Sequence, residues 1–194
     1  MLRFPTLAAI AALSTAVYAQ DGTVPVSGAD SPTADVPKLS IGDKAPKPQL
    51  KKIVKGEFPD EFEKDTVYVV EFWATWCPPC RREMPDLERL GHSLDPQRFA
   101  VIGLSVDEDE HGVREYLNDK GITFARFIDK DLKIARDLLG VSVYPTTILI
   151  APDGTLIGRM VGPRQWESRA MHDLLRDAFD GKPVRLEDIP VYAG

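Results

Sequence analysis

Short runs of apolar residues alternate along the middle of this chain with stretches in which apolar residues recur at helical spacing. Residues 67–73 form an apolar run broken by one acid, and residues 99–106 form a second run; both are typical of strands buried inside a sheet. A helix is predicted between them at 78–93, and another at 109–120. Strands and helices that alternate in this way predict an α/β sheet.

The second half of the chain continues the alternation and then reverses direction. Short strands are predicted at 124–128 and 146–150, with a helix at 132–139 between them. The turn-forming residues 152–154 lead the chain back into a strand at 155–160. This hairpin adds antiparallel strands, so the central sheet is expected to be mixed.

The last predicted helix is marked by four apolar residues, each four positions after the one before. They are Trp166, Ala170, Leu174 and Ala178. Residues four apart lie on one face of a helix, so this helix is expected to bury that face. The predicted architecture is therefore a central mixed sheet flanked by helices.

The N-terminal 19 residues have the pattern of a secretory signal peptide. Arg3 supplies a minimal positive charge, and residues 7–17 are mostly apolar and rich in alanine. A small residue, Ala19, stands where signal peptidase would cleave, so we expect residues 1–19 to be removed and the protein to be exported to the periplasm or the extracellular space. The apolar run is short for a membrane span, and the alternative is an uncleaved anchor.

Composition divides the remainder of the chain into three parts. Residues 20–38 are rich in Pro, Gly, Asp and Ser and are expected to be a flexible linker. Residues 39–180 form the single predicted domain. Residues 181–194 form a C-terminal tail, whose Leu186 and Ile189 can pack onto that domain.

Bulk composition and charge limit the classes of partner. The 194 residues are 43% hydrophobic and 28% charged, which suits one globular domain with tails. The formal net charge is −6, and an acidic chain is a poor partner for nucleic acid or an anionic membrane. We therefore expect no nucleic-acid partner, and we expect a monomer.

The candidate chemistry lies at the end of the first apolar strand. Cys77 and Cys80 are the two cysteines of the chain, and they are separated by Pro78 and Pro79. At a strand-to-helix junction, Cys77 would lie at the helix N-terminus, where unpaired N–H groups and the helix dipole stabilise a thiolate. Cys80, one turn later, could close a small disulfide, and the two prolines fit the first helical turn because their missing N–H groups cost little there.

Three less reactive interpretations compete with a redox pair. A purely structural disulfide is possible in an oxidising compartment, but so small a ring constrains the unfolded chain little. A metal site would need two further ligands, and His92, His111 and His172 are scattered without ligand spacing. Two unpaired structural cysteines are the third interpretation. We expect no metal and no cofactor beyond the Cys77–Cys80 disulfide itself.

The sequence around the cysteines resembles the active-site segment of the thioredoxin superfamily. Residues 72–85, Phe-Trp-Ala-Thr-Trp-Cys-Pro-Pro-Cys-Arg-Arg-Glu-Met-Pro, are most similar to the exported TlpA/ResA-like branch, which includes proteins of cytochrome c maturation. Residues 41–46 resemble the opening segment of that branch, and residues 143–147 resemble the loop that carries the cis-proline of the superfamily. Residues 107–121 match the place where the branch inserts an extra helix. The resemblance, which covers about 39–180, implies a thioredoxin-like fold with an N-terminal extension and an inserted helix near 109–120.

The same resemblance implies roles at the redox centre. Cys77 would be the nucleophile and Cys80 the resolving thiol. Pro145 would be cis, would face the cysteines, would hinder metal capture and would leave the preceding carbonyl free to dock a substrate as an added strand. Tyr144 and Thr146, on either side, would bind substrate. The alternatives are an ordinary turn proline at Pro145 and a side chain that caps the core at Tyr144.

Three further side chains are placed near the cysteines by the resemblance. Trp76 would shield the disulfide, the alternative being simple core packing. Glu71 matches the buried acid of thioredoxins, although related exported proteins often have a neutral residue there. Burial would raise its pKa and allow it to take a proton from Cys80. Glu83 matches an acid that ResA-like proteins carry near the disulfide. For both glutamates the alternative is a solvated position.

Two charged runs beside these motifs are given no catalytic role. Residues 107–110 are interpreted as an acidic helix start, which the helix dipole favours. Arg81 and Arg82 are interpreted as surface charges, with a role in holding the Cys77 thiolate as the lesser alternative.

The resemblance implies a thiol–disulfide oxidoreductase that acts on protein thiols and disulfides, and we expect a reductase that draws electrons from a membrane donor. An exported dithiol oxidase or isomerase is the first alternative, since the two prolines between the cysteines do not reveal the redox potential. A peroxidase would need a lone peroxidatic cysteine in a different setting, and a non-catalytic binding module would have no need of the Cys-Pro-Pro-Cys motif.

Overall fold

The computed structural model describes residues 39–45, 51–54 and 65–192. The predicted signal peptide and linker lie outside the described residues, as do the last two residues of the predicted tail. No helix among the described residues is long and apolar enough to cross a membrane.

A six-stranded mixed sheet forms the centre of the fold, in the order β1-β4-β3-β2-β5-β6. The strands are β1 (Lys51–Val54), β2 (Val67–Trp73), β3 (Phe99–Ser105), β4 (Ala125–Ile128), β5 (Thr146–Ile150) and β6 (Leu156–Val161). The pairs β2–β3 and β3–β4 are parallel, whereas β1–β4, β2–β5 and β5–β6 are antiparallel. The expected mixed sheet is confirmed.

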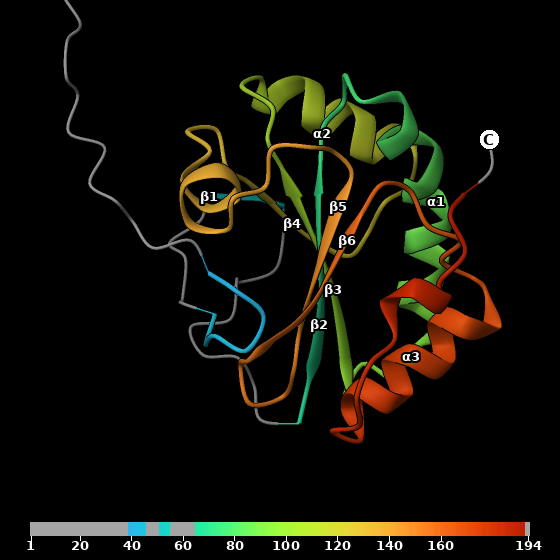
Figure 1. Cartoon of the computed structure of the whole chain (residues 1–194). Coiled ribbons are helices and arrows are strands. Elements are labelled where there is room, and N and C mark those ends of the chain that lie inside the picture. The colour runs from blue at the N-terminus through green and yellow to red at the C-terminus, as the bar shows by residue number, and fades with distance from the viewer. Residues whose placement is uncertain (1–38, 46–50, 55–64, 193–194) are drawn as a thin grey trace, which may run out of the picture. The chain divides into compact units, whose positions relative to one another are not determined.

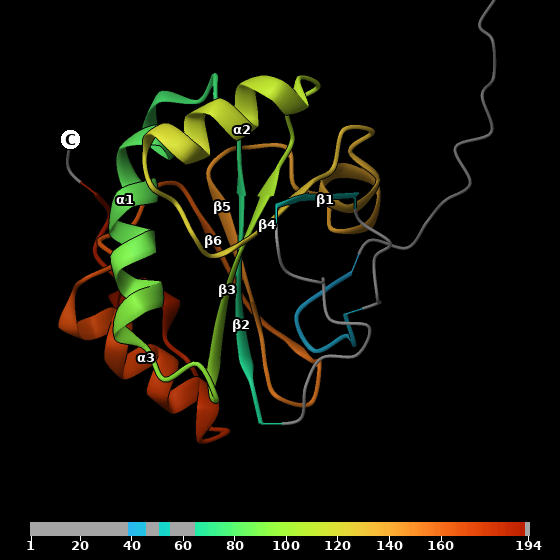
Figure 2. The same cartoon turned by 180° about the vertical axis from the view of Figure 1, so that it is seen from behind.

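Helices cover the sheet on both sides. They are α1 (Pro78–Ser93), α2 (Glu110–Asp119), a π-helix (Lys133–Leu138), α3 (Arg169–Phe179) and a 3-10 helix (Leu186–Asp188). Helices α1 and α3 lie together on one side of the sheet and the π-helix lies on the other, while α2 lies at the end of the sheet where β2 terminates (Figures 1 and 2). The inserted helix predicted near 109–120 is therefore present as α2.

Strand β2 is the buried centre of the sheet. All seven of its residues are buried, because β3 and β5 flank it on its two edges and helices cover its faces. The apolar run predicted this position, and the carboxyl end of the strand leads directly into the loop that begins α1. The predicted bounds of that helix, 78–93, are confirmed.

Two predictions about local structure were wrong. Trp166 does not belong to the last helix, which begins at Arg169 behind the N-cap Ser168. The four-residue spacing extended by coincidence into the preceding loop, where Trp166 is fully buried. Asp107 likewise does not start α2, because Asp109 is the N-cap and Asp107 is buried before it.

The segments that flank the predicted domain core both contact it. Near the N-terminal end, the Gly42 N–H donates to the Leu156 carbonyl (2.8 Å). In the predicted C-terminal tail, Ile189 is buried, and the Pro190 carbonyl accepts from the Gln165 N–H (3.0 Å). The tail therefore packs against the loop between β6 and α3, as its apolar residues suggested.

Candidate active site

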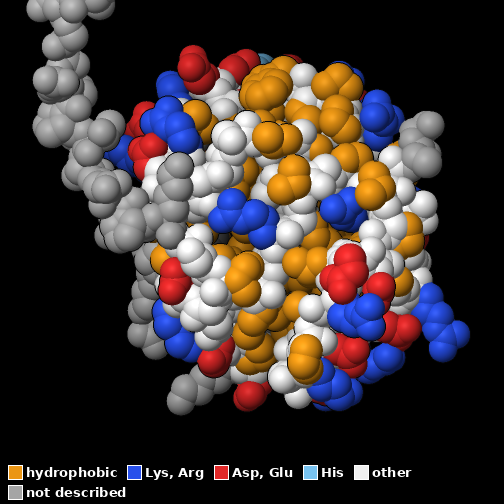
Figure 3. Space-filling view, viewed as in Figure 1, with side chains coloured by type: hydrophobic (Ala, Val, Ile, Leu, Met, Phe, Trp, Pro, Cys, Tyr) orange, Lys and Arg blue, Asp and Glu red, His pale blue; other side chains and the backbone are white. Residues whose placement is uncertain are grey.

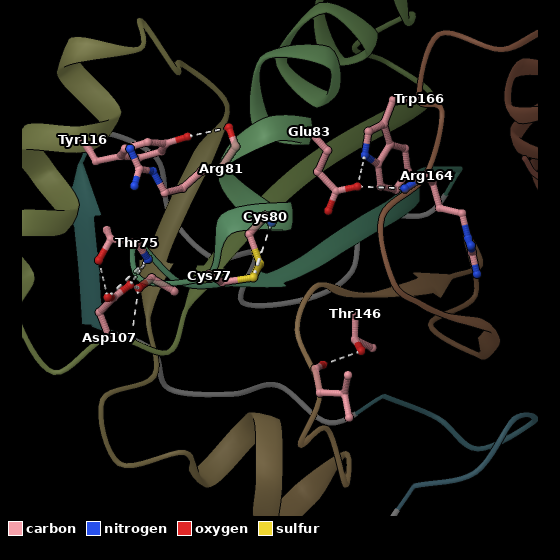
Figure 4. Close-up of a disulfide and its surroundings, with 12 residues drawn as sticks. Thr75, Cys77, Cys80, Arg81, Glu83, Asp107, Tyr116, Thr146, Arg164 and Trp166 are labelled. Carbon is pink, nitrogen blue, oxygen red and sulfur yellow. Dashed lines mark hydrogen bonds between the residues drawn. A yellow bond between two sulfur atoms is a disulfide. The ribbon is translucent and has the colours of Figure 1, made fainter. Parts of the chain in front are cut away.

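Cys77 and Cys80 form a disulfide at the N-terminus of α1 (Figure 4). Their Cα atoms are 5.3 Å apart, Cys77 is the N-cap residue, and its sulfur accepts from the Cys80 N–H at 3.3 Å. Cys80 is completely buried, whereas Cys77 keeps 4% of its surface exposed. The sulfur of Cys77 is thus the one that lies at the helix terminus and at the edge of the solvent.

Trp76 projects from the loop just before the disulfide. Its side chain is 64% exposed, so the core-packing interpretation is wrong. Its ring lies edge-on to Tyr144, with centroids 5.9 Å apart. This contact joins the loop before α1 to the loop before β5.

The loop before β5 carries a cis peptide bond between Tyr144 and Pro145, which excludes an ordinary trans turn proline. Thr146 follows it as the first residue of β5, and its hydroxyl donates to the Val143 carbonyl at 2.7 Å (Figure 4). The sequence placed this segment correctly, whereas its contact with Trp76 depends on the tertiary fold.

Glu71 lies in the middle of β2 with no exposed surface, so a solvated position is excluded. Its cross-strand neighbour on β5 is Thr147, whose hydroxyl donates to Glu71 Oε2 at 2.5 Å. Burial raises the pKa of Glu71 well above its ordinary value, and the nearby Glu83 carboxylate raises this pKa further.

Glu83 lies one turn after Cys80 on α1 and is also buried, which excludes the solvated interpretation. Its Oε2 accepts from the backbone N–H of Arg164 (2.9 Å) and from the indole N–H of Trp166 (3.0 Å), as Figure 4 shows. Burial raises the pKa of Glu83 to about 7, and these two hydrogen bonds oppose the rise because they favour the ionised form.

The two glutamates form a coupled pair. Within the described part of the chain, no N–H or O–H group donates to Oε1 of Glu71 or to Oε1 of Glu83. If Glu71 is protonated, its O–H can donate to the Glu83 carboxylate, and both Oε1 atoms then have a hydrogen-bond partner. Two adjacent buried carboxyls cannot both ionise at low cost, so the pair is expected to retain at least one proton at neutral pH.

Several contacts around the site could not be anticipated. Trp166 and Arg164 hold Glu83 from a loop about 80 residues further along the chain. Tyr116 of α2 donates from its hydroxyl to the Arg81 carbonyl (3.1 Å), and the Arg81 guanidinium lies 5.8 Å from the centroid of the Tyr116 ring. The sequence held only two signals for the contacts of Glu83: Trp166, a large side chain that needs burial, and Arg164, a polar residue after a predicted strand.

Among the described residues, no group of three or more His, Cys, Asp and Glu side chains could hold a metal ion. His92 lies 2.8 Å from Glu88 on the same helix.

The sequence of the chain is similar to those of known thiol–disulfide oxidoreductases. The model of the AhpC/TSA family matches residues 41–159. Thiol-disulfide oxidoreductase ResA of Bacillus thuringiensis (strain Al Hakam) is 31% identical over 134 residues, which cover 69% of this chain and 77% of that protein. ResA of Halalkalibacterium halodurans is 37% identical over 97 residues, or 50% of this chain and 54% of the relative.

Solved structures agree with the sequence matches. A thiol:disulfide interchange protein of the thioredoxin family from Chlorobium tepidum TLS superposes with a TM-score of 0.61 and 28% identity, covering 73% of this chain and 99% of that one. StoA from Bacillus subtilis superposes with a TM-score of 0.53 and 21% identity, covering 61% of this chain and 90% of that one, and supports the fold alone.

Proposed function

Because this chain belongs to the AhpC/TSA family within the thioredoxin superfamily and is a thiol–disulfide oxidoreductase, we propose that it acts outside the cytoplasm as a reductase of protein disulfides. The observation that carries the proposal is the Cys77–Cys80 disulfide at the N-terminus of α1, with Cys77 at the solvent edge and Cys80 buried. Trp76 and Val143, on the two loops beside it, are exposed, and we infer that a protein thiol or disulfide approaches Cys77 there.

In the proposed reaction, the Cys77 thiolate of the reduced protein attacks a substrate disulfide and displaces one substrate thiolate. Cys80 then attacks the Cys77 sulfur of the mixed disulfide, which releases the second substrate thiolate and closes the Cys77–Cys80 bond. Two electrons pass from the dithiol to the substrate, whose two thiolates take up two protons. Helix α1 supports the first step, because its N-terminal N–H groups favour a thiolate at Cys77.

The Glu71–Glu83 pair is proposed to accept the proton that Cys80 loses in the second step. A carboxyl with a pKa near neutrality is suited to this exchange, and that of Glu83 is about 7. The proton held between the two carboxyls returns to the thiol when the reaction runs backwards.

We propose that the substrate is an extended protein segment held by the side chains of Trp76 and Tyr144 and by the backbone around Pro145 and Thr146, whose side chains are buried. Soluble proteins rarely expose several large hydrophobic side chains close together. Near these loops Trp76 is 64% exposed, Val143 56% and Val161 50%. Figure 3 shows hydrophobic side chains at the upper end of the molecule, interspersed with charged ones. Apolar contacts there would hold a substrate whose cysteine faces Cys77.

Export, a membrane electron donor and a place in cytochrome c maturation or a related exported pathway complete the proposal. They are supported by the apolar segment before Ala19 and by the likeness to ResA. Mass spectrometry of protein secreted from a bacterial host should give a mature chain that begins at Gln20. A chain that retains Met1 would contradict cleavage.

The direction of electron flow is tested by the redox potential of the Cys77–Cys80 couple, measured against glutathione and dithiothreitol buffers. A reductase should fall near thioredoxin, at about −270 mV, whereas a value near that of DsbA, about −120 mV, would indicate an oxidase. Reduction of insulin with dithiothreitol as donor should be accelerated by the wild type. No acceleration would contradict the enzymatic proposal as a whole.

A further inference from the structure

One buried carboxylate at the active-site end of the sheet takes no part in the proton transfer described above. Asp107 follows β3 and is only 4% exposed. Its oxygens accept from the Thr75 N–H (3.0 Å to Oδ2), the Thr75 hydroxyl (2.6 Å) and the Ser105 hydroxyl (2.7 Å). Figure 4 shows Asp107 and Thr75 facing each other beside the start of α1.

The register of the sheet explains why Asp107 meets Thr75. Strands β2 and β3 run parallel, with Trp73 opposite Ser105, and the Val106 N–H continues the ladder to the Trp73 carbonyl at 2.9 Å. The residues that follow the two strands therefore emerge side by side. The Ser105 hydroxyl, at the end of β3, accepts from the Asp107 N–H (3.1 Å) and donates to the Asp107 carboxylate, and so links that carboxylate to the strand.

Thr75 belongs to the turn that presents the nucleophile. The Cys77 N–H donates to the Ala74 carbonyl at 3.2 Å, so Thr75 and Trp76 are the central residues of a tight turn. The direction of the Cys77 side chain and of the exposed Trp76 ring follows from this turn. Thr75 is the residue of the turn that Asp107 holds through both backbone and side chain.

Asp107 stabilises the turn strongly because its buried carboxylate has few hydrogen-bond partners other than Thr75 and Ser105. No lysine, arginine or histidine among the described residues forms an ion pair with Asp107, so Thr75 and Ser105 supply the hydrogen bonds that compensate its burial. A buried carboxylate is stable only while such bonds persist, and bonds to a charged group are stronger than those between neutral groups. Movement of Thr75 would leave the buried Asp107 carboxylate without two of its hydrogen bonds.

We propose that Asp107 is a positioning residue that fixes the 74–77 turn through Thr75 and thereby sets the reactivity of the Cys77 sulfur. The proposal rests on the function proposed above. Thiolate attack requires the sulfur to lie in line with the substrate disulfide and at the helix N-terminus, so a small displacement of the turn slows the reaction.

The test uses the full mature chain with Cys80→Ser, which leaves Cys77 as its single thiol. Alkylation by iodoacetamide, followed across pH, reports both the thiolate pKa and the rate. Thr75→Val, which keeps the shape and removes the hydroxyl, should lower the rate about tenfold, the size expected for one charge-assisted hydrogen bond, and displace the pH profile. Thr75→Ser should restore the rate to within about twofold.

The matched control is Thr123→Val. The Thr123 hydroxyl also donates to a partly buried carboxylate, that of Glu88, but at the far end of α1. This variant should lose stability without a change in the alkylation profile. A Thr75→Val profile that superimposes on that of its parent would overturn the positioning role. A parent whose Cys77 reacts no faster than a free thiol would instead overturn the proposed function.

Asp107→Asn provides a second, independent variant should Thr75→Val fold poorly. The amide carries no charge and has one acceptor oxygen instead of two, so its hydrogen bonds with Thr75 are no longer charge-assisted. The Cys77 rate should fall by a similar factor, and the double variant should lose less than the sum of the two single losses because both substitutions weaken the same contact. Strictly additive losses would contradict the proposal.

Discussion

The two buried glutamates have unequal hydrogen-bond partners. Glu83 receives two N–H donors from the loop before α3, whereas Glu71 receives one hydroxyl from Thr147. Donors favour an ionised carboxyl, so the shared proton is expected to reside on Glu71. Glu71 is therefore expected to be protonated before Cys80 reacts, and the ionised Glu83 is the carboxyl of the pair that can gain the proton, with Glu71 passing it on.

Glu71→Gln should slow disulfide exchange and stabilise the fold at neutral pH. The amide keeps the shape, accepts from Thr147 and donates to Glu83, but carries no exchangeable acid proton. A group that never ionises is less costly to bury than a carboxylate. Exchange rates across pH and denaturant midpoints for the two proteins test this. If both remained as in the wild type, Glu71 would have no role as a proton carrier.

The two cysteines should behave asymmetrically. Cys77→Ser should abolish attack on substrate disulfides. Cys80→Ser should accumulate mixed disulfides with substrate proteins, because the buried thiol that resolves them is gone. Non-reducing gels of protein recovered from cells measure the adducts. Equal behaviour of the two variants would refute the assignment of nucleophile and resolving thiol.

Among the elements of the fold, the loop between β6 and α3 supplies the hydrogen bonds that lower the pKa of Glu83 on α1. Trp166 is buried there with its indole N–H donating to Glu83, and the C-terminal segment pairs with the same loop through Gln165 and Pro190. Residues far apart in the chain thus determine the protonation of a side chain one turn after Cys80.

Trp166→Phe should raise the pKa of Glu83 above about 7, because the ionised carboxylate loses a donor. The variant should therefore lose more stability at pH 8 than at pH 5, by about 1–3 kcal/mol. Denaturant unfolding at the two pH values measures this difference.

Trp73→Phe is the matched control for that experiment. Trp73 is equally buried, but its indole nitrogen has no hydrogen-bond partner among the described residues. Its replacement should reduce packing by a similar amount and leave the pH dependence unchanged. A pH-independent loss in Trp166→Phe would show that its hydrogen bond does not affect Glu83.

For the whole molecule, the raised pKa of Glu83 predicts how stability depends on pH. A carboxyl with a folded pKa above its unfolded value contributes stability that is fully present below about 4.5 and is lost as pH rises through about 7. The free energy of unfolding should fall by up to about 3 kcal/mol over this range, since one pKa unit corresponds to about 1.4 kcal/mol.

Urea unfolding of the oxidised protein between pH 4.5 and 8 measures this decline. Glu83→Gln should make the decline shallower, because an amide does not titrate, and the decline that remains comes from the buried Glu71, whose pKa is also raised. A wild-type stability that rises across this range would show that groups with lowered pKa values outweigh the glutamate pair.

Features that depend on neighbouring residues could be predicted before the fold was known. The periodicity of residues 67–73 and 78–93 predicted β2 and α1, and the motif around Cys77 and Cys80 indicated the redox pair at their junction. The segment 143–147, which carries Pro145, was recognised for the same reason, because its signature is contiguous. Strands, helices and short motifs are specified locally, so a single sequence reveals them.

The partners of the polar residues depend on the tertiary fold and could not be predicted. The burial of Glu71 against Glu83, of Asp107 against Thr75 and of Trp166 in a loop follows from strand register and helix docking. A carboxylate in a sequence looks the same whether it is solvated or buried. Its environment is set by groups brought together from distant parts of the chain, since burial of a polar group depends on the partners that compensate it.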